Sequence, residues 1–275
     1  MRNRIIVALI CVPLLFVALF FLPPYIFTGV VAIICAICAY ELLHTVAPRS
    51  SERSRIYGVF AATLIPVGTY FDITLQVFLA VALLLLSLMF FEACIAFKTI
   101  RKIPFTQILV TVFAGAVIPL MLSSLITLRN MQEGRLIVLL PVISAFITDA
   151  GAYFTGILVG KHQAFPLISP KKTVEGCVGG VVIGTLFLMI YGVVLVFSTY
   201  YEVRFWALLL YGVIGAAATQ LGDLAFSLIK REYDIKDYGK ILPGHGGMLD
   251  RFDSMVFASP AICLLVVVIP AIVVK

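Results

Sequence analysis

The chain has 275 residues, of which 62% are hydrophobic and only 12% are charged, and its mean hydropathy is +1.13. These values exclude an ordinary water-soluble domain and indicate an integral membrane protein. The apolar stretches are long enough for helices of about 20 residues across a bilayer, and they lack the alternation of transmembrane β-strands. We therefore expect an all-α, polytopic helical bundle.

The hydrophobic pattern predicts nine transmembrane helices. In chain order, they are Ile5–Leu22, Tyr25–Val46, Ile56–Tyr70, Ile73–Phe91, Phe105–Leu128, Leu136–Gly160, Gly176–Phe197, Phe205–Ile229 and Met255–Val274. The first resembles a secretory signal, but its apolar run exceeds the usual length of about 7–15 residues and no small-residue cleavage site follows. We expect one continuous membrane domain without a soluble domain, in which residues 1–104 form N-terminal helices and residues 105–275 carry the polar loops.

The distribution of basic residues predicts the orientation. With a cytoplasmic N-terminus, 16 of the 20 lysines and arginines fall inside, and four fall outside: Arg129, Arg135, Arg204 and Lys275. This bias follows the positive-inside rule. Topology and attraction to anionic lipids then explain the net charge of +6, so we expect no nucleic-acid partner.

Asp149 belongs to the stretch TDAGAYFTGILVG, inside a predicted span. On a helix it shares one face with Tyr153, Gly156 and Gly160, which predicts a stripe that lines a cavity or packs closely on another helix. An acid inside a span is costly and is by default a functional candidate. Pairing with a lysine, or capping a broken helix, is the structural alternative.

The stretch SPKKTVEGCVGG offers a helix start, because Ser169 is a good cap and Pro170 suits the first helical position. Lys171 and Lys172 would then lie in the first turn, where the helix dipole disfavours cations unless an anion also binds. This pattern predicts a phosphate site; a basic pair that only sets topology is the alternative. Glycines recur every fourth residue in the following span, which predicts close helix packing: Gly176, Gly180 and Gly184.

The stretch QLGDLAFSLIKREYDIKD places four polar residues on one face of a helix near its cytoplasmic end. These are Asp223, Ser227, Lys230 and Arg231, at i, i+4, i+7 and i+8. A carboxylate, a hydroxyl and two cations together predict a metal and phosphate site. The alternative is a snorkelling basic pair that ends a span, with Asp223 as its buried partner.

The stretch KILPGHGGMLDRFDS precedes the last predicted helix, which we expect to begin near Ser254. Its glycines permit sharp turns and close backbone approach to a ligand. Asp250 is the better metal candidate, because Mg²⁺ takes one or two carboxylates together with substrate phosphates. Asp253 suits a helix cap, and Arg251 suits either phosphate binding or neutralisation of the two aspartates.

Together these motifs closely resemble the signature of the phosphatidate cytidylyltransferases, also called CDP-diacylglycerol synthases. The matching runs are Asp149, Ser169–Gly176, Gly222–Asp223, Ser227–Arg231, Lys236–Asp237, Leu242–Gly247 and Asp250–Asp253. The resemblance covers the C-terminal half densely, whereas the N-terminal half matches only in its hydrophobic layout.

The resemblance implies an enzyme that converts CTP and phosphatidate into CDP-diacylglycerol and pyrophosphate with Mg²⁺. It further implies a homodimer in the bacterial cytoplasmic membrane, with its site on the cytoplasmic side. Asp223 and Asp250 would bind the metal; a second metal ion or a monovalent cation is left open. The expected catalytic residues are Asp149, Lys172, Asp223, Ser227, Lys230, Arg231, His245, Asp250 and Arg251. The expected substrate-binding residues are Ser169, Lys171, Lys172, Lys230, Arg231, Lys236, Gly246 and Gly247.

The chemistry of that reaction is mainly a problem of charge, since two polyanions must meet while pyrophosphate leaves. A phosphate monoester has a second pKa of about 6 and is largely ionised at neutral pH, so a general base is not obligatory. His245 is therefore expected to bind phosphate or to orient the glycine loop, with a purely structural role as the alternative.

Three other functions are weighed against this one. A CDP-alcohol phosphotransferase would carry D-G-x-x-A-R followed by paired aspartates, which the sequence lacks. A CTP-dependent polyprenol kinase resembles this family only distantly, and the passage from PGHGG to DRFD argues against it. A transporter of an anionic metabolite would usually carry internal repeats and a midplane site, whereas here the polar residues crowd one membrane face.

Overall fold

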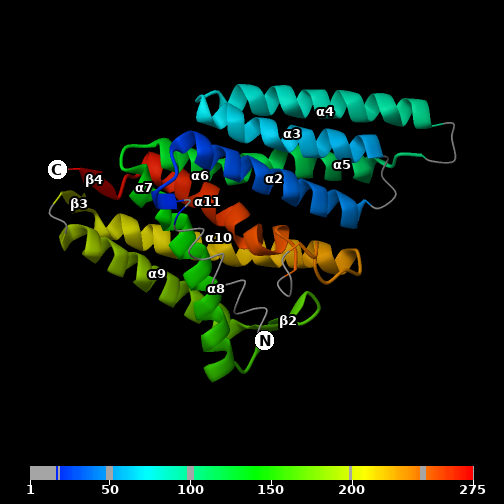
Figure 1. Ribbon diagram of the computed structural model, residues 1–275. Coiled ribbons are helices and arrows are strands. Elements are labelled where there is room, and N and C mark those ends of the chain that lie inside the picture. Colours follow the sequence, from blue (N-terminus) through cyan, green and yellow to red (C-terminus); the bar gives the residue numbers. More distant parts are fainter. Residues whose placement is uncertain are drawn as a thin grey trace. The chain divides into compact units, whose positions relative to one another are not determined.

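The structure is a computed structural model that describes Val17 and residues 19–47, 52–97, 102–197, 200–241 and 246–274 (Figure 1). These residues form two compact units. The first contains the chain up to Asn130 together with Tyr233–Arg251, and the second contains Met131–Glu232 and the chain from Phe252 onward. These units are defined by how the helices pack. The predicted division at residue 104 separates segments by the polar loops that they carry, so it stays a prediction.

The first unit is built from helices. They are α2 (Pro24–Val46), α3 (Glu52–Tyr70), α4 (Thr74–Ala96), α5 (Phe105–Val112), the π-helix η1 (Phe113–Val117) and α6 (Ile118–Asn130). Helix α3 packs against α2, α4 and α6, and Figure 1 shows α3 and α4 running side by side. Ile65 of α3 forms a buried core with Val81 and Leu85 of α4.

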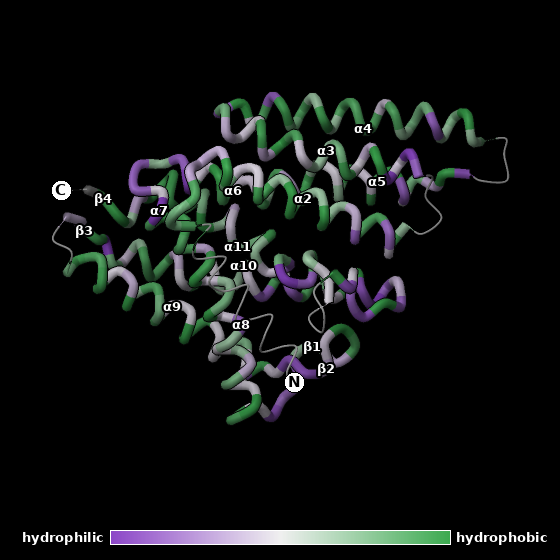
Figure 2. Tube along the Cα trace, viewed as in Figure 1, coloured by the Kyte–Doolittle hydropathy of each residue, from purple (hydrophilic) through white to green (hydrophobic). Residues whose placement is uncertain are grey.

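Helix α4 covers this core with one narrow face. Within it only Val81, Leu85 and Met89 are buried, and Figure 2 shows the helix coloured hydrophobic along most of its length. A helix that is apolar on all sides and mostly exposed suits a lipid environment, since lipid tails are as apolar as leucine.

The second unit combines long helices with one short β-hairpin and one two-stranded sheet whose strands are far apart in the chain. Its elements are α7 (Gly134–Ile137), α8 (Leu139–Val159), β1 (Gln163–Phe165), β2 (Ser169–Thr173), α9 (Val174–Phe197), β3 (Tyr201–Val203), α10 (Phe205–Glu232), most of α11 (Leu249–Val268) and β4 (Ile272–Val274). Helix α9 packs against α8 and α10. Strand β1 pairs with β2, and β3 pairs with β4, both antiparallel.

The all-α, polytopic prediction is confirmed. Among the described residues, seven helical stretches are long and apolar enough to cross a membrane, when Phe105–Asn130 (α5, η1 and α6) and Gly134–Val159 (α7 and α8) each count as one. Helix α3 is not among these seven, but it matches the predicted third span. Most of the predicted first span, Ile5–Leu22, lies outside the described residues, which include only Val17 and residues 19–22 of it. The count of nine is therefore not confirmed, but the chain is a multi-pass membrane protein.

The predicted position of the last helix is wrong by six residues at each end. We expected Met255–Val274, whereas α11 spans Leu249–Val268. The helix stops before Pro270, because proline lacks an N–H and disfavours helical backbone in the residue before it. The chain then pairs as β4 with β3, and the Arg204 N–H donates to the Ala271 carbonyl at 2.8 Å.

The predicted helix start at Ser169 and Pro170 is also wrong. Residues Ser169–Thr173 form β2, and α9 begins at Val174. Thr173 supplies the cap instead, since its Oγ1 accepts the Gly176 N–H at 3.1 Å, as a capping threonine does for the third helical residue. The phosphate site expected from two lysines in a first helical turn is therefore not formed in that way.

The prediction of close packing at the glycine repeat is confirmed. A β-carbon placed on Gly176 would lie 2.8 Å from the Ala152 carbonyl oxygen, and one on Gly180 would lie 2.9 Å from the Thr148 carbonyl oxygen. At Gly184, a β-carbon would overlap the Thr148 hydroxyl. Helices α8 and α9 thus approach backbone to backbone, which is how small residues hold membrane helices together.

We expect Gly180→Leu to lower the free energy of unfolding by about 1–3 kcal/mol, because the new side chain overpacks the α8–α9 contact. Reversible unfolding in mixed micelles measures the change. Gly29→Leu is the matched control, since a β-carbon on Gly29 meets no atom within 4 Å. Equal stabilities of the two variants would contradict the packing role.

Candidate active site

Asp223 is the centre of a charged cluster in the second unit. It lies on α10, and its Oδ2 pairs with the Lys172 Nζ from β2 at 2.8 Å. Its Oδ1 accepts a hydrogen bond from the Ser227 hydroxyl one helical turn later, at 3.2 Å. The shared helical face predicted for Asp223 and Ser227 is thereby confirmed. The Lys172 and Asp223 side chains are 22% and 30% exposed, so water can still reach the pair.

Lys230 lies two turns beyond Asp223 and faces the start of α11. Its Nζ is 4.0 Å from Asp253 Oδ2, and both side chains are nearly buried. Asp253 also experiences the negative charges of Asp223 and Asp149. The helix begins four residues before Asp253, so the interpretation of this residue as a helix cap is wrong.

Asp253 lies in the charged cluster, a placement that sequence reasoning missed because this residue was interpreted as a helix cap. The available signal was its spacing of three residues from Asp250, which places both acids on one face of a helix. A close approach of α10 and α11 allows the contact, because a β-carbon on Gly222 would lie 2.7 Å from the Asp253 carbonyl oxygen.

Asp149, on α8, contacts the N-terminal part of α11. Its Oδ2 accepts a hydrogen bond from the Ser254 hydroxyl at 2.8 Å. The predicted stripe below it divides in two: Tyr153 is exposed, whereas Gly156 and Gly160 face Thr173 at the end of β2. The contact with Ser254 gives Asp149 a structural partner without assigning it to catalysis.

The β1–β2 hairpin carries the two predicted phosphate-binding lysines. Lys171 is exposed, while its neighbour Lys172 is half-buried and turned to Asp223, as expected for successive residues of a strand. Ser169 is half-buried in β2, opposite Phe165. Arg231 lies beside this hairpin, since its Nε donates to the Ile168 carbonyl at 3.1 Å.

The hairpin is fixed at its base by Glu175 in the first turn of α9. Glu175 Oε2 accepts the backbone N–H groups of Lys161 and His162 at 3.1 and 3.2 Å. Its Oε1 lies 2.6 Å from the His162 Nδ1. A carboxylate at this position also complements the helix dipole. The strand that carries Lys172 therefore leaves the helices in a defined direction.

Asp250 belongs to the first unit, in the first turn of α11. Its Oδ2 accepts the backbone N–H groups of Tyr238 at 2.8 Å and Gly247 at 3.0 Å. Gly246 has a φ of 85°, a value that favours glycine, and a β-carbon there would lie 3.1 Å from Asp250 Oδ2. The predicted tight turn is thus confirmed at Gly246. Asp250 lies in the helix and not in the loop, contrary to the expected helix start near Ser254.

Three other predicted site residues are Lys236, Arg251 and His245. Lys236 and Arg251 are exposed. His245 lies outside the described residues, so the alternatives for its role stay open.

The donor set limits how a metal could bind. Within the described parts of the chain, no three His, Cys, Asp or Glu side chains lie close enough to hold a metal ion. Magnesium usually takes only one or two carboxylates and completes its shell with water and phosphate oxygens. Asp223, in the second unit, and Asp250, in the first, each offer the carboxylate oxygens that Mg²⁺ takes as ligands.

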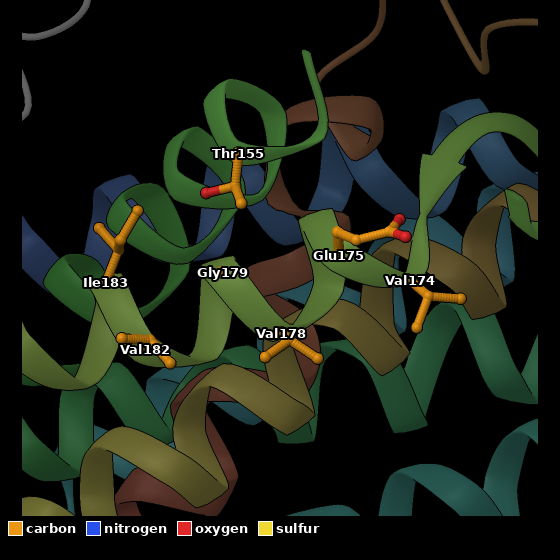
Figure 3. Close-up of a pocket in the computed structure, with 7 residues that line it drawn as sticks. All are labelled: Thr155, Val174, Glu175, Val178, Gly179, Val182 and Ile183. Atoms are coloured by element: carbon orange, nitrogen blue, oxygen red, sulfur yellow. The ribbon is translucent and has the colours of Figure 1, made fainter. Parts of the chain in front are cut away.

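An apolar groove of about 510 Å³ lies between α8 and α9 in the second unit. Figure 3 shows Glu175 and Val174 towards one end and Ile183 and Val182 towards the other, with Thr155 projecting from α8. The groove is mostly lined by aliphatic side chains and includes neither Asp223 nor Lys172. It therefore lacks the charges that a triphosphate requires and is separate from the charged cluster.

Comparison with known proteins gives a consistent family assignment. The profile of the cytidylyltransferase family matches residues 2–269. A phosphatidate cytidylyltransferase of Staphylococcus haemolyticus (strain JCSC1435) is 42% identical over 136 residues, which are 50% of this chain and 51% of the relative. A phosphatidate cytidylyltransferase of Bacillus subtilis (strain 168) is 45% identical over 136 residues, 49% of each chain. The aligned segment thus spans about half the length of these relatives.

Proposed function

Because the chain belongs to the cytidylyltransferase family, we propose that it is a phosphatidate cytidylyltransferase, which transfers the cytidylyl group of CTP to phosphatidate. A phosphate oxygen of phosphatidate attacks the α-phosphorus of CTP and forms a new P–O bond. The bond from that phosphorus to the β-phosphate oxygen breaks, and pyrophosphate leaves. The products are CDP-diacylglycerol and pyrophosphate.

The observation that carries this proposal is the placement of two lysines beside paired carboxylates at one end of α10. Lys172 meets Asp223 and Lys230 faces Asp253, so each cation is already oriented before an anion arrives. Charged groups fixed in advance stabilise a transition state without the cost of reorganisation. An incoming triphosphate would replace the carboxylates as the partner of these lysines, since it carries more negative charge than a single carboxylate.

We extend the proposal to Mg²⁺, with Asp223 and Asp250 as ligands. Bound there with the nucleotide, the ion would neutralise phosphate charge and assist departure of pyrophosphate. The residues themselves would bind and orient phosphates: Lys172 and Lys230 near the carboxylates, and Arg231 beside the hairpin. A bidentate guanidinium is well suited to phosphate.

The proposed location is the cytoplasmic face of a bacterial cytoplasmic membrane, with the chain acting as a homodimer. CTP arrives from water, whereas the acyl chains of phosphatidate stay in lipid, so the reacting groups should meet at the headgroup level. The predicted orientation, with 16 of 20 basic residues inside, supports a cytoplasmic site. The homodimer rests on the family resemblance alone.

The proposal is tested with purified protein in phosphatidate liposomes containing Mg²⁺ and CTP labelled at the α-phosphate. We expect label to enter the organic phase only when phosphatidate and Mg²⁺ are both present. A parallel reaction with γ-labelled CTP should leave its label in water as pyrophosphate. If the γ-label enters lipid instead, the protein is a kinase; if neither label enters lipid while the protein is folded, nucleotidyl transfer is refuted.

A further inference from the structure

Glu41 is a buried carboxylate that the reaction chemistry does not use. It is the one acidic residue of α2 and is only 2% exposed. An acid within an apolar span is costly to bury and marks a functional position unless its oxygens are satisfied. Its partners therefore indicate why it is there.

Those partners are the first backbone groups of α11, more than 200 residues later in the chain. Glu41 Oε1 accepts the Met248 N–H at 3.0 Å, and Oε2 accepts the Leu249 N–H at 2.8 Å. The first N–H groups of a helix have no partner within the helix, and the helix dipole favours a negative charge there. Glu41 thus caps α11 from a different helix, and its use of both oxygens suits a cap better than a metal ligand.

Two glycines make room for this carboxylate. A β-carbon on Gly247 would lie 2.5 Å from Glu41 Oε2, and one on Gly239 would lie 2.6 Å from Glu41 Cδ. Side chains at these positions would push Glu41 away from the helix start. The glycines of this segment therefore serve the Glu41 contact as well as the turn at Gly246.

The same short backbone segment is also held by Asp250. The Gly247 N–H donates to Asp250 Oδ2, while the next two N–H groups, of Met248 and Leu249, donate to Glu41. Three successive N–H groups are thus divided between two carboxylates. Any shift of the backbone at Met248 would also shift Asp250, which follows one residue after Leu249.

We propose that Glu41 is a positioning residue: it fixes the backbone of Gly247–Leu249 and thereby the direction of the Asp250 carboxylate. This inference rests on the proposed function only in so far as Asp250 takes part in that reaction. The cap itself is independent of any activity.

The first test is hydrogen–deuterium exchange of the wild-type protein over Gly246–Arg251. We expect the Met248 and Leu249 amides to be protected. In Glu41→Gln, which keeps the size but loses the charge and one acceptor, exchange of these amides should be roughly 10- to 100-fold faster, the scale expected for weakened charge-assisted hydrogen bonds. Glu52→Gln is the control, since Glu52 is exposed in the first turn of α3. Unprotected amides in the wild type would overturn the cap, even if the variant fails to fold.

The second test measures turnover and the Mg²⁺ concentration for half-maximal rate in the same variants. We expect Glu41→Gln to need at least several-fold more Mg²⁺, and Glu41→Asp to recover part of the loss because its charge is retained. Faster amide exchange with unchanged Mg²⁺ dependence would overturn the positioning role while leaving the cap. Lack of turnover in the folded wild type would instead refute the proposed function and leave the exchange result to decide the cap.

Discussion

Asp223→Asn is expected to reduce the rate of CDP-diacylglycerol formation by roughly 10²- to 10³-fold, while the protein still folds. Asparagine keeps the size of the side chain and can still accept the Ser227 hydroxyl, but it cannot balance the charge of Lys172. Disturbing one preorganised cation at a reacting phosphate, here Lys172 or a metal ion held by Asp223, costs about 3–4 kcal/mol of transition-state stabilisation. Initial rates in liposomes, measured with α-labelled CTP, check this result.

The Mg²⁺ dependence of the same variant separates two roles of Asp223. If the carboxylate binds the metal, Asp223→Asn should need much more Mg²⁺ for its remaining activity. If it only orients Lys172, the KM for CTP should rise at an unchanged Mg²⁺ requirement. Glu232→Gln, at the exposed end of the same helix, is the matched control. Activity of Asp223→Asn within twofold of that control would refute both roles.

Asp250→Asn is the second change for which we expect a loss of turnover of roughly 10²-fold or more. One oxygen of asparagine can still accept the Tyr238 and Gly247 N–H groups, so the turn should persist. The negative charge, which a magnesium ligand requires, is lost. The expected signature is therefore a catalytic defect with wild-type thermal stability.

Asp234→Asn is the control for this change. Asp234 is exposed and has a φ of 53°, a backbone conformation that asparagine also adopts readily. Its rate should equal that of the wild type. If Asp250→Asn unfolds the protein as well as inactivating it, the carboxylate acts on the turn and not on the reaction.

The helices were predictable because a bilayer imposes a length and a composition that one segment shows by itself. The Asp223–Ser227 contact was predictable for a similar reason, since both residues lie one turn apart on one helix. Two possible helix starts lie within the five residues of β2: Ser169–Pro170 and Thr173. Because this segment pairs with β1 as a strand, the helix begins after Thr173. Such pairing is not visible in helical spacing.

The contacts that sequence could not predict join distant segments. The Lys172–Asp223 pair spans a hairpin and a helix, and the Lys230–Asp253 pair joins two helices. Each of these residues stands out as a charge in a largely apolar chain, but the sequence does not show which aspartate pairs with which lysine. Glu41 did carry a signal, because it is an acid in an apolar span, yet its partners are backbone groups that no residue type identifies.

The cap on α11 has a consequence for biosynthesis. Glu41 emerges from the ribosome before its partner, since the amide that it must bind, that of Leu249, follows 208 residues later. At about 5–20 residues per second this interval lasts roughly 10–40 s. During that time α2 holds a carboxylate without its final partners in or near the membrane. We therefore expect chains truncated before Met248 to be retained by insertion chaperones and degraded by membrane proteases faster than the full chain.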